Sequence, residues 1–240
     1  MKNDFKIGEI VTLKTHPLLY NLKIKGDGKL VPPFMIVKEV FIEAKTKKIY
    51  SEELGKKIAD RVKYTCAFFD DNRTEFKEVT LYESMLAKYN EIYIARIDEN
   101  KIEKGANYKS LIEEVKDYSI PKYDYSKIVF FKTKKFEIFK KRDSIKTDGE
   151  KDGKTPKLQY IVNYSSPDFV LCGIKNNDNQ TEYYPNGNLK KETADILFKV
   201  KWFNASQMKF SDIYLPAECF TDIQPFPSKK PYNVKESVEN

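Results

Sequence analysis

Residues 62–86, VKYTCAFFDDNRTEFKEVTLYESML, contain the pattern on which the predicted fold rests. Apolar residues alternate at the start of this stretch, which is the period of a strand with one buried face. The residues that share this face are Val62, Tyr64, Cys66 and Phe68. The polar residues that follow, DDNRT, are typical of a turn, and residues 76–81 return as a second strand. We therefore predict a β-hairpin, followed by a short helical turn at residues 81–86.

The same pattern recurs in the second half of the chain. Residues 64–86 align without a gap on residues 198–220, FKVKWFNASQMKFSDIYLPAECF, at a constant offset of 134. The identical pairs are Phe69/Phe203, Phe76/Phe210 and Leu81/Leu215, and several other pairs keep their size or chemistry. Upstream, residues 10–15 resemble residues 128–133, and residues 35–37 resemble residues 160–162. Three matched blocks in one order predict an internal duplication.

Composition and length favour two small β modules. The 240 residues include 16 Tyr, 16 Phe and one Trp but only 9 Gly, and aromatic residues pack well on a pleated sheet. A small bent sheet buries enough surface only when it closes on itself. We therefore predict a mainly β (α+β) protein with two divergent SH3-like small β-barrel modules, at residues 1–87 and 125–224. Residues 88–124 are the predicted connector, and residues 225–240 a predicted disordered tail.

The clearest helical period of the chain lies in this connector, at residues 107–118. The residues on one stripe are Leu111, Ile112, Val115 and Tyr118. Asn107 is of a type that caps helix N-termini, and Pro121 follows the stretch. We therefore expect the connector to contain one helix that packs its apolar stripe on the modules.

The stretches FKIGEIVTLKT at residues 5–15, FKVKWFNA at 198–205 and LPAECF at 215–220 resemble parts of a known family. The family is that of the small, uncharacterised YodC-like proteins. Its members have a Gly-Asp-x-Val-x-Leu-Lys-Ser opening and a Cys-x-Trp-Phe strand before a Pro-x-x-Leu ending. Here the first half of the chain holds the opening and the second half holds the ending. The resemblance implies a compact SH3-like barrel and brings no established activity.

Few groups in the sequence are suited to catalysis. The only histidine, His16, precedes Pro17 in a predicted loop, and we expect it to be exposed or loosely packed. Cys66 is expected to pack in the core, and three cysteines without a CxxC spacing predict neither a disulfide framework nor a zinc site. No phosphate-binding loop or nucleophile elbow is present in the sequence. We therefore expect no enzymatic activity, no cofactor and no bound metal.

One catalytic alternative is a metal-dependent hydrolase. Asp70 followed by Glu75 and Lys77 is similar to the set in metal-dependent nucleases, where two carboxylates hold Mg²⁺ and a lysine steadies the attacking water. Here the three residues straddle a predicted tight turn, and the aligned residues of the second half do not preserve the set. Solvated turn charges are therefore the preferred interpretation of these residues.

Residues 132–146, KTKKFEIFKKRDSIK, depart from the even mixing of charge elsewhere, with seven basic groups and two acids. Basic side chains can neutralise phosphates while aromatic rings stack on unpaired bases. The other interpretation is a strand whose lysines keep a sheet edge soluble and unpaired. The residues predicted for nucleic-acid contact are Lys134, Lys135, Phe136, Phe139, Lys140, Lys141 and Arg142.

A protein partner is the first functional hypothesis. Two modules side by side would create a groove, and Tyr183 and Tyr184 could anchor a bound peptide. The net charge of +7 arises from 43 basic and 36 acidic groups of interleaved sign, so it does not by itself indicate nucleic acid. No apolar run approaches the ~20 residues that cross a bilayer. We predict a cytoplasmic adaptor with tandem SH3-like modules, with nucleic-acid binding as the alternative and the oligomeric state left open.

Overall fold

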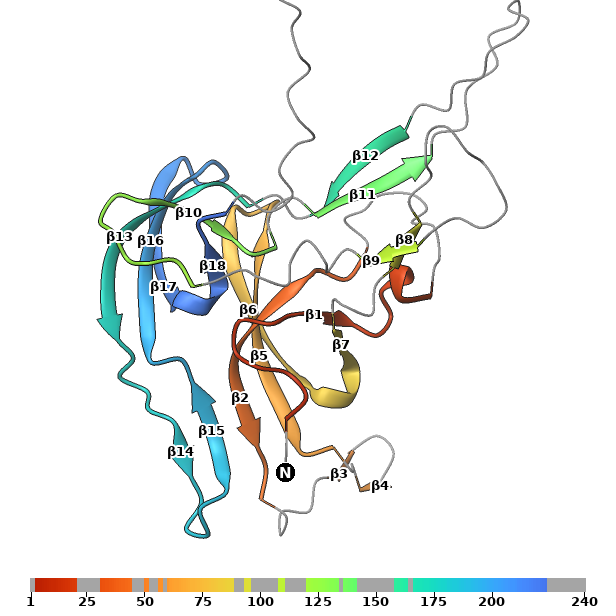
Figure 1. Cartoon of the computed structure of the whole chain (residues 1–240), viewed down its shortest axis with the longest axis vertical. Coiled ribbons are helices and arrows are strands. Elements are labelled where there is room, and N and C mark those ends of the chain that lie inside the picture. Colours follow the sequence, from red (N-terminus) through yellow and green to blue (C-terminus); the bar gives the residue numbers. More distant parts are fainter. Residues whose placement is uncertain are drawn as a thin grey trace, which may run out of the picture.

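In the computed structural model (Figure 1), the described residues form two main antiparallel sheets, of seven and five strands, and three two-stranded ladders. The described residues are 3–20, 31–44, 60–88, 120–133 and 166–223, with shorter pieces at 50–51, 56–57, 93–95, 108–110, 136–141 and 158–163. The strands are β1 (Ile10–Leu13), β2 (Met35–Ile42), β3 (Tyr50–Ser51), β4 (Lys56–Lys57), β5 (Val62–Asp70), β6 (Glu75–Tyr82), β7 (Leu86–Lys88), β8 (Tyr93–Ala95), β9 (Tyr108–Ser110), β10 (Ile128–Phe131), β11 (Phe136–Lys141), β12 (Leu158–Asn163), β13 (Phe169–Asn176), β14 (Glu182–Tyr183), β15 (Leu189–Thr193), β16 (Ile196–Asn204), β17 (Lys209–Pro216) and β18 (Phe220–Thr221).

The chain is mainly β, as its composition predicts. Within the described residues, the helices are short 3-10 turns: η1 (Pro17–Tyr20), η3 (Glu83–Met85) and η6 (Ala217–Cys219). None of the described helices is long and apolar enough to cross a membrane. We call β1, β2, β5, β6 and β7 the first unit, and β10, β13, β16, β17 and β18 the second unit. Strand pairing among the described residues leaves both sheets open rather than closed into barrels.

The two units share one pairing pattern. All six paired positions of β2 with β5 recur 134 residues later between β13 and β16. All eight paired positions of β5 with β6 recur at the same offset between β16 and β17. A register shift interrupts the first of these pairings after Val37 in one unit and after Leu171 in the other. The pairing therefore supports the gapless alignment of residues 64–86 with residues 198–220.

The upstream blocks are matched in one case and not in the other. Leu13 of β1 pairs with Leu86, and Phe131 of β10 pairs with Phe220, so β1 and β10 occupy the same place in their units. The match of residues 35–37 with residues 160–162 is wrong. The counterpart of β2 is β13, whereas residues 160–162 belong to β12 and pair with β11. A short apolar run is common to most strands, and only its pairing partner distinguishes one from another.

The connector does not form the predicted helix where the structure describes it. Residues 108–110 form β9, which pairs with β8 in an antiparallel ladder. The prediction of a helix over residues 107–118 is therefore wrong at these positions, and Asn107 and residues 111–118 lie outside the described residues. A short isolated helix is marginal in water. Strand pairing satisfies the same backbone groups, so a tertiary contact outweighs the weak helical pattern.

Strand β5 is buried on both faces. Tyr64 and Cys66 lie in the first unit's own core with Val62, as their alternation predicts, and Phe68 packs at the margin of this core. On the opposite face, Ala67 and Phe69 are also buried, in a larger core that contains residues of the second unit. Strands covered on both faces read as continuous apolar runs, which explains why CAFF interrupts the alternation at residues 66–69.

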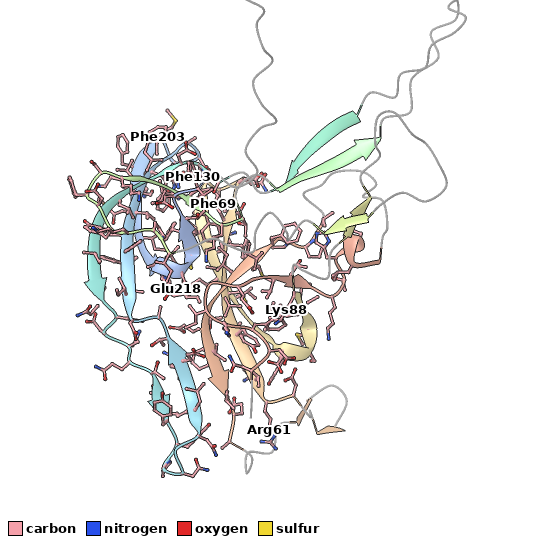
Figure 2. All side chains as sticks on the ribbon, in the orientation of Figure 1. Arg61, Phe69, Lys88, Phe130, Phe203 and Glu218 are labelled. Atoms are coloured by element: carbon pink, nitrogen blue, oxygen red, sulfur yellow. The ribbon has the colours of Figure 1, made fainter. Side chains whose placement is uncertain are left out.

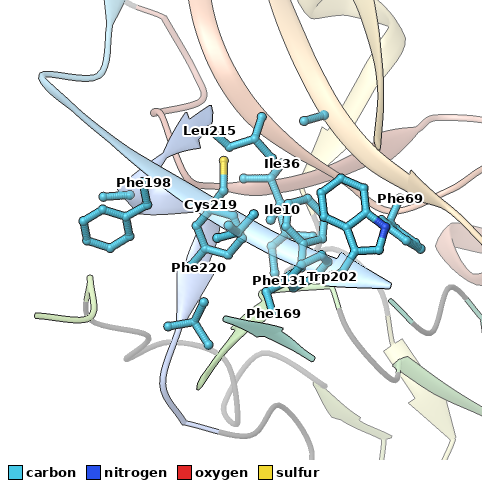
Figure 3. Packing of buried hydrophobic residues seen from close by; sticks show 14 of the residues in the cluster. Ile10, Ile36, Phe69, Phe131, Phe169, Phe198, Trp202, Leu215, Cys219 and Phe220 are labelled. Carbon is cyan, nitrogen blue, oxygen red and sulfur yellow. The ribbon is translucent and has the colours of Figure 1, made fainter. Parts of the chain in front are cut away.

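Aromatic contacts join the two units, and Figure 3 shows Phe69 of the first unit beside Trp202 of the second. The ring centroid of Phe76 lies 5.1 Å from that of Phe131, 5.3 Å from Phe169 and 5.5 Å from Trp202. The Trp202 indole N–H donates a 2.9 Å hydrogen bond to the carbonyl of Thr74, in the turn between β5 and β6. Aromatic pairs of this kind contribute about 0.5–1.5 kcal/mol each beyond their burial. At this contact the units are joined by a packed core and not separated by a groove.

A hairpin of the second half extends the first sheet. β14 and β15 lie between β13 and β16 in the chain, and residues 191–193 of β15 pair with residues 39–41 of β2. Figure 1 shows this arm running beside β2. The Lys191 ammonium lies 3.7 Å from the Glu39 carboxylate across the pairing. The first sheet therefore contains strands from both predicted modules, and the two sequence halves are not independent sheets.

The shared core predicts that a substitution in the first unit destabilises the second. Phe69 is 2% exposed, whereas its counterpart Phe203 is 45% exposed. Phe69→Ala should lower the free energy of unfolding by about 3–5 kcal/mol, and Phe203→Ala by at most about 1 kcal/mol. Urea unfolding followed by fluorescence of the single tryptophan, Trp202, measures the free energy of unfolding at a site within the second unit. An unchanged fluorescence midpoint in Phe69→Ala would show that the units unfold independently.

Candidate protein-binding surface

An aromatic cluster lies exposed at one end of the second sheet. Phe203 of β16 and Phe210 of β17 pair across the strands, with their ring centroids 5.5 Å apart in an edge-to-face arrangement. Phe210 is 73% exposed, and Met208, in the turn between the strands, is 77% exposed. Figure 2 shows Phe203 at the outer end of this sheet. We call Phe203, Met208 and Phe210 the aromatic patch.

The same sheet face carries charge beside the aromatic patch. The Asp212 carboxylate lies 3.1 Å from the ammonium of Lys199 and 3.4 Å from that of Lys201. The hydrogen bond from Lys199 is the largest of the effects that lower the pKa of Asp212 below its ordinary value. Farther along the face, the Lys175 ammonium lies 5.0 Å from the centroid of the Tyr214 ring. The aromatic patch at the end of this face is therefore bordered by charged residues, as the apolar core of a protein contact surface is bordered by a polar rim.

The aromatic patch is the exposed counterpart of the contact inside the chain. Phe203 and Phe210 occupy the positions of Phe69 and Phe76, which also form an edge-to-face pair, with centroids 5.0 Å apart. The turn residues preceding the second strand, Thr74 and Met208, both have positive φ, at 55° and 50°. One copy of this arrangement is packed in a protein core and the other faces water.

The two tyrosines predicted to contact a peptide lie on the arm, in different environments. Tyr183 is on β14 and is exposed, whereas Tyr184 is half-buried and donates a 2.8 Å hydrogen bond from its hydroxyl to the carbonyl of Ile42. Tyr184 is thus engaged in holding the arm on the first unit. Of this pair, Tyr183 is the one whose side chain is largely available to a partner.

The basic segment predicted to bind nucleic acid is only partly described. At its start, Lys132 and Thr133 are buried, so Lys132 is not placed to contact a phosphate. Lys134, Lys135 and Arg142 lie outside the described residues. The structure gives the backbone of β11 and its pairing with β12 for the other predicted contact residues, but does not describe their side chains. Those residues are Phe136, Phe139, Lys140 and Lys141.

Lys132 lies at a second contact between the units. Its ammonium is 3.4 Å from the carbonyl oxygen of Gly8, and burial lowers its pKa. Glu218 lies in the same place, and burial raises the pKa of its carboxyl group. Gly8 has a φ of +83°, and a Cβ built on it would lie 2.7 Å from the Glu218 Cβ and 2.9 Å from the Glu218 carbonyl oxygen. The first unit therefore approaches the second too closely here for any residue larger than glycine.

The expected exposure of His16 is wrong. His16 is fully buried, and its ring centroid lies 4.9 Å from that of Phe34. Burial lowers its pKa to about 4, so the imidazole is neutral at neutral pH. Burial also raises the pKa of both Cys66 and Cys219 to about 12, which keeps these thiols protonated and poorly nucleophilic.

The residues of the hydrolase alternative form a turn and an ion pair. The Asp70 carboxylate lies 2.7 Å from the Lys77 ammonium and accepts hydrogen bonds from the backbone N–H groups of Asn72 and Arg73. The Lys77 contact is the main cause of the lowered pKa of Asp70. Glu75 is the cross-strand neighbour of Asp70. Within the described ranges, no three His, Cys, Asp or Glu residues are grouped so that they could hold a metal ion.

Comparison with known proteins leaves the geometry as the main guide to function. No family model, curated protein or solved structure matches this chain.

The aromatic patch was not among the residues predicted for binding. Its phenylalanines are two of the three identities in the repeat, but identity alone does not reveal which copy is buried. A signal lies two residues before the first phenylalanine of each pair, on the same strand. This residue is Ala67 in the first unit and Lys201 in the second. A small apolar residue favours close packing of that face, whereas lysine favours contact with water.

A matched pair of glycines tests the contact between Gly8 and Glu218. Gly187, on the arm, also has positive φ, at +78°, but a Cβ built on it would meet nothing within 4 Å. Gly187→Ala should cost about 1–2 kcal/mol, for the left-handed backbone alone. Gly8→Ala should cost about 1–3 kcal/mol more, because the added methyl group overpacks the contact. Chemical denaturation measures both values, and equal losses would contradict the close approach.

Proposed function

We propose that this chain is a non-enzymatic adaptor that binds a protein partner through the aromatic patch of its second unit. The observation that carries the proposal is the exposure of Phe203 and Phe210 at positions whose counterparts, Phe69 and Phe76, make a protein–protein type of contact within the chain. Large aromatic side chains supply most of the free energy of many protein interfaces. A rigid hairpin presents them without the entropic cost of ordering a loop.

The proposal includes an SH3-like architecture that arose by duplication. Its support is the strand order within each unit, β7-β1-β2-β5-β6 and β18-β10-β13-β16-β17. In each unit a 3-10 turn precedes the strand that comes last in sequence, η3 before β7 and η6 before β18. The repeated register and the resemblance of parts of the sequence to YodC-like proteins favour the same architecture. Such small β domains commonly recognise peptides and proteins with exposed aromatic residues.

The absence of enzymatic activity is part of the proposal. It is supported by the state of the candidate catalytic groups: Asp70 is paired with Lys77, His16 is enclosed against Phe34, and Cys66 and Cys219 are buried. Catalytic groups need access to substrate and a pKa matched to their task. Their pairing and burial favour structural roles for these residues.

Nucleic-acid binding by residues 132–146 stays the alternative prediction. The burial of Lys132 removes one of its basic groups from contact with phosphate. The alternative and the main proposal use different residues, so one experiment with nuclease treatment separates them.

Affinity capture from nuclease-treated lysate tests the proposal. The bait proteins are the wild type, Phe210→Asp and Tyr183→Asp, because each variant removes one exposed aromatic residue and adds the same charge. We expect the wild type and Tyr183→Asp to retain a common set of proteins, identified by mass spectrometry, that Phe210→Asp loses. Retention of the same set by all three baits would contradict a role for the aromatic patch. Loss of the set in Tyr183→Asp alone would assign binding to the arm, and loss of all binding on nuclease treatment would favour the nucleic-acid alternative.

A further inference from the structure

We propose that the partner of the aromatic patch is the first unit of a second copy of this chain, docked head to tail by the same kind of contact that joins the two units within one chain. This inference rests on the proposed function, because it assigns an occupant to the same surface. It follows from the asymmetry of the contact between the units. The first unit contributes the outer face of its sheet, and the second contributes the open end of its core. Each unit therefore has a docking face and a receiving face, and one of each is used.

The unused docking face belongs to the second unit. In the first unit, Ile36, Ala67 and Phe69 lie on the docking face and are buried against the second unit. Their counterparts in the second unit, by the shared register, are Val170, Lys201 and Phe203. Val170 is 42% exposed where Ile36 is fully buried. The face that docks in one unit is thus available in the other.

The receiving face of the first unit is open at its edge, whereas Met35 and Leu86, the counterparts of Phe169 and Phe220, are buried in the first unit's own core. In the second unit, this face includes Lys132, Thr133 and Cys219, and all three are buried. Lys14, Thr15 and Met85 occupy the corresponding positions of the first unit, as the shared hydrogen bonds Lys14 N–H to Met85 carbonyl and Lys132 N–H to Cys219 carbonyl show. Lys14 and Thr15 are exposed, and Met85 is 47% exposed. Phe68, which occupies the position of Trp202, is half-buried.

Strand pairing supplies a further pair of counterparts. Within the chain, the arm of the second half, β14 and β15, lies between β13 and β16 and pairs with residues 39–41 of β2. The first half has a smaller hairpin, β3 and β4, in the same place between β2 and β5. The counterparts of residues 39–41 are residues 173–175 of β13, whose partner among the described strands at these positions is β16 alone. An open strand edge of this kind accepts an added strand.

Two differences make the contact between chains weaker than the contact within one. The position of Ala67 is Lys201 in the second unit, and the position of Gly8 is Ser126, which also has positive φ, at 69°. Both changes add atoms, and at Gly8 the internal contact leaves no room for a Cβ. Docking is therefore confined mainly to the aromatic patch, and association between chains depends on concentration. Because the two faces differ, the assembly grows as an open chain or closes as a ring.

Sedimentation velocity of the full chain over about a hundredfold concentration range tests the inference, since mass action governs such association. The variants are Phe210→Asp, which alters the docking face, Met85→Asp, which alters the receiving face, and Tyr183→Asp as a control on the arm. We expect the wild type and the control to rise above the monomer mass of 28.1 kDa as concentration increases. Each of the other variants should stay monomeric, with the dissociation constant raised at least about tenfold. Circular dichroism confirms that each variant is folded.

Mixing provides the decisive arm of the experiment. Phe210→Asp keeps its receiving face and Met85→Asp keeps its docking face, so an equimolar mixture should form a dimer that neither forms alone. Three results would each overturn the inference: the wild type stays monomeric, either variant leaves association unchanged, or the mixture stays monomeric. Self-association that is lost in Phe210→Asp but kept in Met85→Asp would also overturn it, and would indicate contact between two aromatic patches instead. The two proposals can also fail separately. If the wild type stays monomeric but Phe210→Asp still loses captured proteins from lysate, the proposed function stands and this inference fails.

Discussion

The insertion of the Phe69–Phe76 pair into the core of the second unit is the contact on which the rest of the structure depends. Each unit alone is a small sheet with limited apolar surface to bury, and small domains of this kind are marginal. The second unit surrounds Phe76 with Phe131, Phe169 and Trp202, so its core is completed by residues from the first. The second half in turn stabilises the first unit, because β15 of the arm adds a strand to the first sheet. The two units thus form one body, although each repeats the strand order of the other.

Repetition of a unit that docks asymmetrically has a physical consequence. A docking face that meets a receiving face leaves one unmatched face at each end of the pair. In this chain the unmatched faces carry Phe203 and Phe210 at one end and Met85 at the other. Beside the exposed aromatic pair, Lys201 occupies the position of Ala67, and its charge favours contact with water without removing the apolar centre. The functional proposal and the proposed self-association both follow from this arrangement.

The sequence predicted some parts of the structure well and others poorly, for identifiable reasons. The hairpins at residues 62–81 and 196–215 were predictable because strong alternation and turn residues are local signals. The helix predicted over residues 107–118 was wrong at 108–110, where a pairing partner distant in sequence determines the structure. His16 was misjudged because proximity to a proline does not reveal that Phe34 covers the ring. The exposure of Phe203 was hidden for a similar reason: its identity with Phe69 shows only that the two residues align, whereas burial depends on which neighbour the other unit supplies.

A double-mutant cycle between Phe76 and Trp202 tests the shared core most directly. Phe76→Leu and Trp202→Phe are mild enough to leave the chain folded, and urea unfolding by circular dichroism gives the free energy of each single variant and of the double variant. Residues in contact couple, and the account predicts a coupling free energy of at least about 0.5 kcal/mol across the two units. Additivity within about 0.3 kcal/mol, as for distant and independent sites, would contradict it.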